Sequence, residues 1–280
     1  MRTALPVLFA LLLAGCASMG GGAQVEAPRE IAVEADATPA AQVLNSSMNG
    51  LVARTSPSYV NLIVHEGKKQ QRDTFGEMPE ALTSGSGFVI DGNGHVLTAA
   101  HVGVKLGTEV EAHSSDGRIY EGRVVAIQPD NDMSLVKLSN FTGSPVTPAA
   151  STCLKAGDPL FSLGRPHAQG DTARIGQLES MSFGRAVSYQ GYGYPDAMVL
   201  RMNTRKGESG GPVFDANGDL VGMVVSTLSD GNGRPLNLAH AIPLSALAKF
   251  VCANTQCSER WQAVSKQNSS QCPAAIAVKG

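Results

Sequence analysis

Three short segments of this chain carry residue types that together can perform nucleophilic catalysis. Residues 98–102 read Thr-Ala-Ala-His-Val, residues 132–136 read Asp-Met-Ser-Leu-Val, and residues 207–212 read Gly-Glu-Ser-Gly-Gly-Pro. A serine hydroxyl is a weak nucleophile at neutral pH, so it needs an adjacent base to take its proton. A histidine ring suits that task, and a carboxylate can hold the ring in one tautomer. The three segments supply one residue of each kind.

The side chains expected to act together are His101 as base, Asp132 as orienting carboxylate and Ser209 as nucleophile. Asp130 is close enough in sequence to be a rival carboxylate. The backbone N–H groups of Gly207 and Ser209 are expected to form an oxyanion hole, since a glycine lets the chain turn there. Taken alone, the segment around Ser209 could be a glycine-rich turn and His101 could be a packing residue. Three motifs in the order of a known catalytic set favour catalysis instead.

The elements that must position these residues are short strands. The chain of 280 residues has 31 glycines and 15 prolines, and brief apolar runs recur between turn signals. This pattern, with little helical periodicity, favours an all-β fold of two six-stranded antiparallel barrels with a short C-terminal helix over residues 244–251. The strands are expected around residues 59–65, 85–90, 95–99, 109–113, 120–127 and 133–138, and around 160–164, 176–180, 197–202, 212–214, 219–226 and 237–242.

The order histidine, aspartate, serine is that of the chymotrypsin-type triad, and the segments around it resemble the HtrA/Deg protease domain, within the trypsin-like serine proteases. The resemblance covers about residues 50–250. The segments that carry it are residues 56–63, 84–98, 154–158, 163–166 and 241–243. It implies a chymotrypsin-like double barrel with the cleft between the barrels. It also implies serine endopeptidase activity on envelope or misfolded proteins.

Two departures from the family pattern matter. Residues 203–208 read Asn-Thr-Arg-Lys-Gly-Glu where the family has an Asn-Pro-Gly-Asn run, so the oxyanion loop is expected to be set differently. The chain also leaves little room after the protease segment for the PDZ domain that many members carry. The alternative function is therefore a catalytically silent pseudoprotease, or a chaperone-like module that binds unfolded segments in the same cleft. The three intact catalytic positions favour the enzyme.

The resemblance also indicates where the primary substrate pocket lies. The residues expected to line it are Asn203, Ser226, Thr227, Leu228 and His240. Asn203 stands where an acidic residue would select Lys or Arg, so cleavage after basic residues is not expected. Leu228 favours a small or medium aliphatic residue before the scissile bond. His240 could instead hydrogen-bond a polar or acidic substrate side chain, or turn its ring away. Gly210 and Gly211 are expected to leave room for substrate.

The N-terminus resembles a lipoprotein export signal. Residues 1–15 combine a positive start at Arg2 with an apolar stretch too short to span a bilayer, and a Leu-Ala-Gly-Cys tetrapeptide ends at Cys16. The tetrapeptide resembles the bacterial lipobox, so Cys16 is the expected lipidation site; an ordinary secretory signal is the alternative. Residues 16–45 are expected to be a lipidated N-terminus and flexible tether. Resemblance to Gram-negative sorting signals favours the outer membrane, facing the periplasm.

The cysteine content also suits an exported protein. The cysteines that remain after Cys16 are Cys153, Cys252, Cys257 and Cys272. An even number fits the oxidising periplasm, and four cysteines permit three pairings. We expect two disulfides that hold the C-terminal tail, one of them reaching Cys153. A zinc site is the weaker alternative, because no second ligand pair follows Cys252 and Cys257.

Composition narrows the partners. The net charge is −2 and Lys and Arg are spread along the chain, so no nucleic acid is expected. No metal-ligand spacing is found among the six histidines, and no cofactor is expected. The expected partners are protein or peptide substrates and, through the N-terminal lipid, a membrane. The expected domains are a protease domain over residues 46–250 and a cysteine-containing tail over 251–280.

Overall fold

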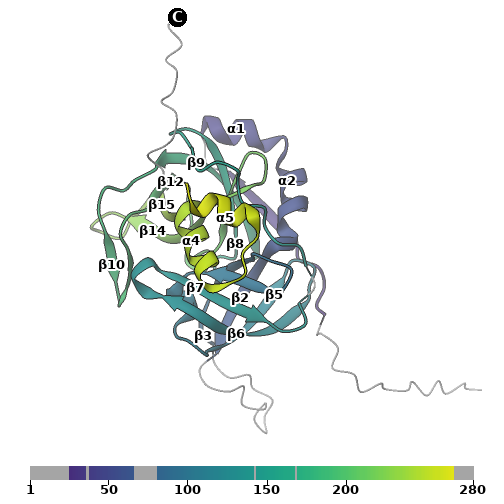
Figure 1. Ribbon diagram of the computed structural model, residues 1–280. Helices are drawn as coiled ribbons and strands as arrows, with labels where there is room; N and C mark the ends of the chain where they lie inside the picture. The colour runs from purple at the N-terminus through teal and green to yellow at the C-terminus, as the bar shows by residue number, and fades with distance from the viewer. Residues whose placement is uncertain (1–24, 36–37, 66–80, 142, 168, 268–280) are drawn as a thin grey trace, which may run out of the picture.

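Two β-barrels form the body of the protein in the computed structural model (Figure 1). The structure describes residues 25–35, 38–65, 81–141, 143–167 and 169–267. The first barrel is closed and antiparallel, with strand order β2-β3-β4-β7-β6-β5. Its strands are β2 (Tyr59–His65), β3 (Ala81–Val89), β4 (His95–Thr98), β5 (Glu109–Ser114), β6 (Ile119–Gln128) and β7 (Met133–Leu138).

The second barrel has strand order β9-β12-β15-β14-β13-β8 and closes where β8 pairs with β9. Its strands are β8 (Pro159–Gly164), β9 (Asp171–Ser180), β12 (Met198–Arg201), β13 (Pro212–Asp215), β14 (Leu220–Ser229) and β15 (Pro235–Pro243). The expected strands of both barrels are present, so the predicted all-β double barrel is confirmed.

Strand alternation explains why the sequence predicted these elements well. In β6, Tyr120 and Val124 point into the barrel while Glu121 and Arg123 are exposed, which is the period of two expected of a half-buried strand. In the second barrel, the buried rings of Phe161 and Phe214 pack with centroids 5.2 Å apart. Apolar side chains of both barrels belong to one continuous buried cluster.

One further strand and two helices precede the first barrel. Strand β1 (Ile31–Ala35) pairs parallel to β9, outside the ring of six. Helix α1 (Pro39–Asn45) begins after Thr38, whose hydroxyl accepts a hydrogen bond from the Ala41 N–H at 3.2 Å. Helix α2 (Met48–Thr55) and the short 3-10 turn η1 (Ser56–Ser58) lead into β2.

The predicted flexible tether is therefore wrong for residues 31–35 and 39–45, which pack on the second barrel. The physical reason is spacing rather than composition. Within α1, the apolar side chains of Ala40, Ala41 and Leu44 share one face of the helix and are all buried. Residues 1–24, with the expected lipidation site Cys16, lie outside the described part of the chain.

The C-terminal region is also more ordered than the predicted tail. The predicted helix is confirmed as α4 (Leu244–Asn254), and a second helix, α5 (Glu259–Ser265), follows it. The indole N–H of buried Trp261 donates to the Ile90 carbonyl of the first barrel at 3.3 Å. A disulfide joins Cys252 to Cys257, with a Cα–Cα distance of 5.0 Å.

Cys153 is also disulfide-bonded, whereas Cys272 lies outside the described residues. The pairing of Cys252 with Cys257 uses both cysteines of the proposed zinc site. Among the described residues, no group of three or more His, Cys, Asp or Glu side chains is placed to hold a metal ion.

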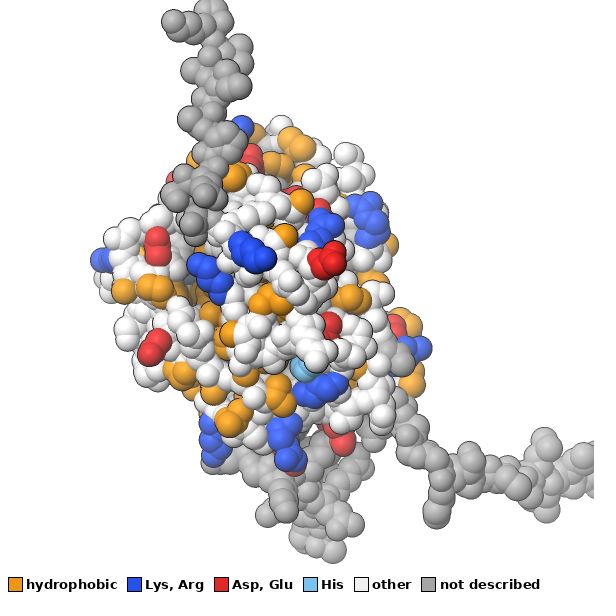
Figure 2. All heavy atoms as spheres, viewed as in Figure 1, with side chains coloured by type: hydrophobic (Ala, Val, Ile, Leu, Met, Phe, Trp, Pro, Cys, Tyr) orange, Lys and Arg blue, Asp and Glu red, His pale blue; other side chains and the backbone are white. Residues whose placement is uncertain are grey.

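The remaining elements lie beside the junction of the barrels. They are helix α3 (Ala100–Gly103), the 3-10 turn η2 (Pro129–Asn131) and the hairpin of β10 (Val187–Tyr189) and β11 (Tyr192–Tyr194), which the sequence analysis did not predict. In the described part of the chain, no helix has the length and apolar character needed to cross a bilayer. Lys, Arg, Asp and Glu side chains are dispersed over the face in Figure 2.

Candidate active site

His101 is positioned by the end of β4 and the single turn of α3. Ala99 is extended and acts as the N-cap of α3, so the chain turns sharply before the histidine. The His101 backbone N–H donates to Asp132 Oδ1 at 3.0 Å, and ring Nδ1 lies 2.9 Å from Asp132 Oδ2. Because a carboxylate only accepts hydrogen bonds, we assign the proton to Nδ1, which leaves Nε2 as the basic nitrogen.

Asp132 is held in a demanding local conformation. It follows η2 with a φ of +46°, in the left-handed region that costs a non-glycine residue free energy. Its side chain is fully buried, at 0% exposure. The rival Asp130 lies in η2 and is exposed. The structure therefore brings Asp132, and not Asp130, against His101.

A residue that the sequence analysis missed completes the surroundings of this carboxylate. The Tyr189 hydroxyl, at the end of β10, donates to Asp132 Oδ2 and lies 3.0 Å from His101 Nδ1. Burial, and then the Asp132 carboxylate, raise the pKa of Tyr189 far above its usual range, so the hydroxyl stays a donor. Tyr192, on the other strand of the hairpin, donates to the Val104 carbonyl just after α3 at 3.1 Å. Three of the five tyrosines fall within residues 189–194, which is the signal that could have revealed this hairpin.

The turn that carries Ser209 is fixed by close packing between the barrels. Gly207 and Gly210 have φ values of +98° and +84°. A Cβ on Gly210 would lie 2.1 Å from the Ser86 carbonyl oxygen, and one on Gly211 would lie 2.4 Å from that of Leu163. The expectation that Gly210 and Gly211 leave room for substrate is therefore wrong, because the first barrel and β8 fill that space.

The same packing brings Ser209 to the first barrel. The Ser86 N–H of β3 donates to the Ser209 carbonyl at 2.8 Å. Gly210 contacts Thr98 and Ala99, which directly precede the helix of His101. The Ser209 hydroxyl donates to the Val225 carbonyl at 3.2 Å. Between Ser209 and His101, both described, there is no hydrogen bond in this structure.

In the turn that carries Ser209, the backbone N–H groups of Gly207 and Ser209 have no hydrogen-bond acceptor among the described residues. The preceding carbonyl, of Lys206, accepts from the His167 N–H at 2.9 Å. Because the peptide is trans, the Gly207 N–H points to the opposite side of the chain. The turn therefore offers free donors next to the serine hydroxyl.

The five residues predicted to line the substrate pocket do not form one group. In the pairing of β14 with β15, Ser226 lies opposite His240 and Thr227 lies opposite Ala239. Side chains alternate along a strand, so Thr227 and His240 belong to opposite faces. On one face, the Thr227 hydroxyl is 2.9 Å from that of Thr204, next to Asn203 in the loop before the nucleophile.

On the other face, where Leu228 also lies, His240 is part of a buried cluster. Its Nδ1 is 2.7 Å from the Tyr194 hydroxyl and 3.2 Å from Ser226 Oγ, and its ring centroid is 4.3 Å from that of Phe183. Burial lowers the pKa of His240. These contacts fit the ring-turned-away alternative better than contact with a substrate side chain.

A double barrel with histidine and aspartate on one half and a serine turn on the other is the arrangement of trypsin-like serine peptidases. A family model of the trypsin-like peptidase domain matches residues 85–223. Protease Do-like 5, chloroplastic, of Arabidopsis thaliana is 30% identical over 218 residues, covering 72% of this chain and 67% of that protein. The chain belongs to the HtrA/Deg family of trypsin-like serine endopeptidases.

A further relative and two solved structures are also similar to this chain. Periplasmic serine endoprotease DegP of Escherichia coli (strain K12) is 29% identical over 172 residues, which cover 60% of this chain and 35% of DegP. The active form of the Rv3671c protease from M. tuberculosis has a TM-score of 0.62 at 23% identity, covering 83% of this chain and 95% of that one. A variant of the HtrA-type protease AlgW, with a decapeptide, has a TM-score of 0.59 at 22% identity, covering 72% of this chain and 65% of that one. Both structural likenesses concern the fold.

Proposed function

We propose that this protein hydrolyses peptide bonds by nucleophilic catalysis at Ser209. The observation that carries the proposal is the fully buried Asp132, which binds both the backbone and the ring of His101. His101 Nε2 takes the hydroxyl proton as Ser209 Oγ attacks the carbonyl carbon, and then gives that proton to the leaving amine. Water hydrolyses the resulting acyl-enzyme by the same proton transfers in reverse order.

The N–H groups of Gly207 and Ser209 are proposed to bind the oxygen of the tetrahedral intermediate. Both lack another acceptor among the residues described, so they can receive the oxyanion without breaking an existing hydrogen bond. The Ser209 hydroxyl must rotate away from the Val225 carbonyl to meet His101. One hydrogen bond of 3.2 Å is given up in that rotation, which substrate binding can offset.

A fluorophosphonate probe tests the proposal directly. The wild-type protein should be labelled covalently, with the modified peptide containing Ser209. The Ser209→Ala variant should give no labelling, whereas Asp130→Asn, changed only at the exposed neighbouring acid, should label like the wild type. Absence of labelling in a folded wild-type protein would favour the pseudoprotease alternative.

The proposed substrates are unfolded segments of proteins, cleaved after small or medium aliphatic residues. The proposal rests on the resemblance and on Asn203, which offers no negative charge to a basic substrate side chain. Cut sites in denatured casein should cluster after Val, Ala, Leu or similar residues. Clustering after Lys or Arg would contradict this specificity, and clustering after Glu would restore a role for His240 in binding.

We further propose that the protein is anchored in the bacterial envelope by lipid on Cys16. The proposal rests on the lipobox-like sequence, and it agrees with the periplasmic name of DegP. Membrane fractions should contain the full-length protein, and Cys16→Ser should release it. Mass spectrometry that finds an unmodified Cys16 in the mature protein would rule out the anchor.

A further inference from the structure

The N-terminal segment reaches the residue before Ser209 through a chain of ion pairs. Glu34 of β1 lies directly opposite Arg174 of β9 in the parallel pairing. Arg174 Nη1 is 2.5 Å from Glu34 Oε2, and Arg174 Nε is 2.5 Å from Glu208 Oε1. One guanidinium therefore links strand β1 to the carboxylate next to the nucleophile.

The buried member of this chain depends on its partners. Glu208 is 2% exposed, and burial raises the pKa of its carboxyl group against the opposing effect of Arg174. A charge in such a position is stable only when it is paired and hydrogen-bonded. The planar guanidinium of Arg174 is fixed in orientation because Glu208 holds one nitrogen and Glu34 another. The Arg205 N–H supplies a further hydrogen bond to Glu208 Oε2 at 2.5 Å.

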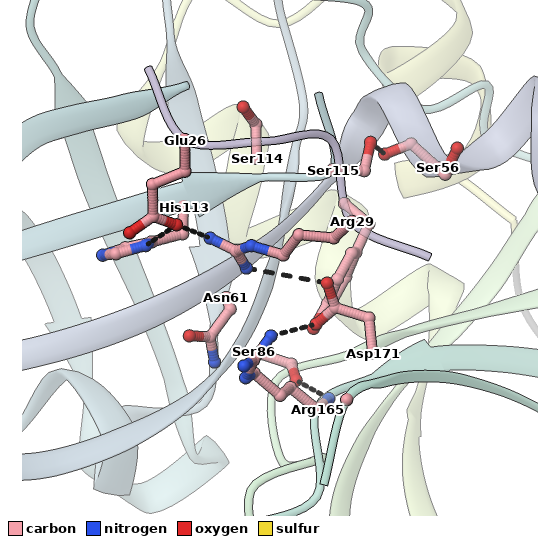
Figure 3. A network of polar contacts seen from close by, with 12 residues as sticks. Glu26, Arg29, Ser56, Asn61, Ser86, His113, Ser114, Ser115, Arg165 and Asp171 are labelled. Carbon is pink, nitrogen blue, oxygen red and sulfur yellow. Dashed lines mark hydrogen bonds and ion pairs between the residues drawn. The ribbon is translucent and has the colours of Figure 1, made fainter. Parts of the chain in front are cut away.

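A second chain of contacts runs from the same segment to Gly207, and Figure 3 shows its members Arg29, Asp171, Arg165 and Ser86. Arg29 Nη1 lies 3.6 Å from Asp171 Oδ2, and Arg165 Nη1 lies 3.3 Å from the other oxygen of that buried carboxylate. The Arg165 N–H donates to Ser86 Oγ at 3.2 Å. The Ser86 hydroxyl donates in turn to the Gly207 carbonyl at 2.9 Å. Both residues that precede Ser209 are therefore connected to residues 29–34.

We propose that β1 is a positioning element of the active site, in which Glu34 acts through Arg174 and Glu208 to hold the Ser209 turn in its reactive geometry. The inference rests on the proposed function, because its effect is read at Ser209. Without the Glu34 carboxylate, Arg174 keeps one partner and can swing away from Glu208. The turn carries both the nucleophile and the oxyanion donors, so a small shift there slows the chemical step more than it weakens substrate binding.

The test compares Glu34→Gln with Glu30→Gln in the full chain. Glu30 is exposed and directly precedes β1, so it is a matched control. Glu34→Gln should lower kcat and the rate constant of fluorophosphonate labelling roughly threefold to thirtyfold, as expected of a residue that acts on the site at a distance. KM should change by less than about twofold. Glu34→Asp, which keeps the charge, should recover part of the rate, and Glu30→Gln should match the wild type.

The outcomes separate this inference from the proposed function. Wild-type protein that is labelled at Ser209, together with an unchanged rate constant in Glu34→Gln, would overturn the positioning role alone. A lower Tm in Glu34→Gln without a change in kcat would also overturn it, since that result would mean that the ion pair only stabilises the fold. A wild-type protein that is not labelled would overturn the proposed function itself.

Discussion

The Asp132 carboxylate receives hydrogen bonds from three donors: the His101 backbone, the His101 ring and the Tyr189 hydroxyl. A buried carboxylate that accepts hydrogen bonds from three donors is held in place without water. Its left-handed backbone conformation costs free energy that the surrounding contacts must offset. These three hydrogen bonds fix the position of the carboxylate that orients the His101 ring.

The triad proposal predicts strongly non-additive effects. Ser209→Ala and His101→Ala should each reduce kcat by about 10⁴ to 10⁶, and the double variant should lose little more, because the residues act as a unit. Asp132→Asn should also be severe, since it favours the wrong tautomer of the His101 ring. These rates are measured with a peptide substrate under saturating conditions. Asp130→Asn is the control, and a larger loss in it than in Asp132→Asn would overturn the assignment.

Removing the Tyr189 hydroxyl should slow catalysis without weakening substrate binding. Tyr189→Phe deletes one charge-assisted hydrogen bond to Asp132, and a loss of about 1.5 kcal/mol corresponds to roughly tenfold in kcat. KM should stay within about twofold. Tyr192→Phe is the matched control, because that hydroxyl binds the Val104 carbonyl instead. Equal kcat values for Tyr189→Phe and the wild type would show that the carboxylate needs only its two histidine donors.

At the scale of elements, strand pairing decides which predicted residues can act together. The register of β14 and β15 places Thr227 and His240 on opposite faces, although both belong to segments expected beside the substrate pocket. The hairpin of β10 and β11, which lies between β9 and β12 in sequence, adds tyrosines to a site whose base and carboxylate belong to the first barrel. Neither arrangement follows from any one segment alone.

The buried His240 should make the protein less stable in acid. Burial, and then Arg185, lower the pKa of His240, while Asp196 opposes them. The unfolded chain therefore binds a proton from about pH 6.5 downward before the folded chain does, so stability falls as the pH drops through that window. The slope is at most about 1.4 kcal/mol per pH unit.

The variant that tests this prediction is His240→Asn, which cannot titrate. Its amide oxygen can replace Nδ1 as the acceptor for the Tyr194 hydroxyl. Its free energy of unfolding, measured by urea titration between pH 7 and pH 5, should depend less on pH than that of the wild type. The difference between the two proteins cancels the contribution of Glu208, whose raised pKa has the opposite effect on stability. Parallel curves for the two proteins would contradict a shifted His240.

At the scale of the whole molecule, the active site depends on how firmly the barrels are joined. Helix α4 contacts both β14 of the second barrel and β7 of the first. Helix α5 then places Trp261 against Ile90, while the Arg260 side chain donates to the Pro148 carbonyl in the connection between the barrels. Residues that follow the second barrel in sequence thus bind the first barrel in space.

Truncating Trp261 should therefore destabilise the entire molecule. Trp261→Ala removes a buried indole and is expected to cost about 3–5 kcal/mol of unfolding free energy. Trp261→Phe keeps most of the packing and loses the hydrogen bond to Ile90, so about 1 kcal/mol is expected. Thermal and urea unfolding measure both values. The exposed Leu236 serves as control, and a loss in Leu236→Ala as large as that in Trp261→Ala would contradict a special role for α5.

Local patterns in the sequence determined most of the architecture and the identity of the catalytic candidates. Strand alternation is a property of consecutive residues, so the strands of both barrels could be predicted without knowing their partners. The motifs around His101, Asp132 and Ser209 are likewise local, because each consists of a few consecutive residues around the catalytic position. The local pattern supported Asp132 over Asp130 only as a hypothesis, which the contacts of His101 with Asp132 then favoured.

Tertiary structure alone decided the supporting contacts. Glu34 and Arg174 are separated by 140 positions, and Tyr189 and Asp132 by 57, so no local pattern links them. The pairing of the strands and its register decide three features of the site. They order β1, they bring Glu208 to its partners, and they set the face on which each pocket residue lies. A one-residue change of register would move every side chain to the other face of its sheet, and that information resides in the packing of the whole molecule.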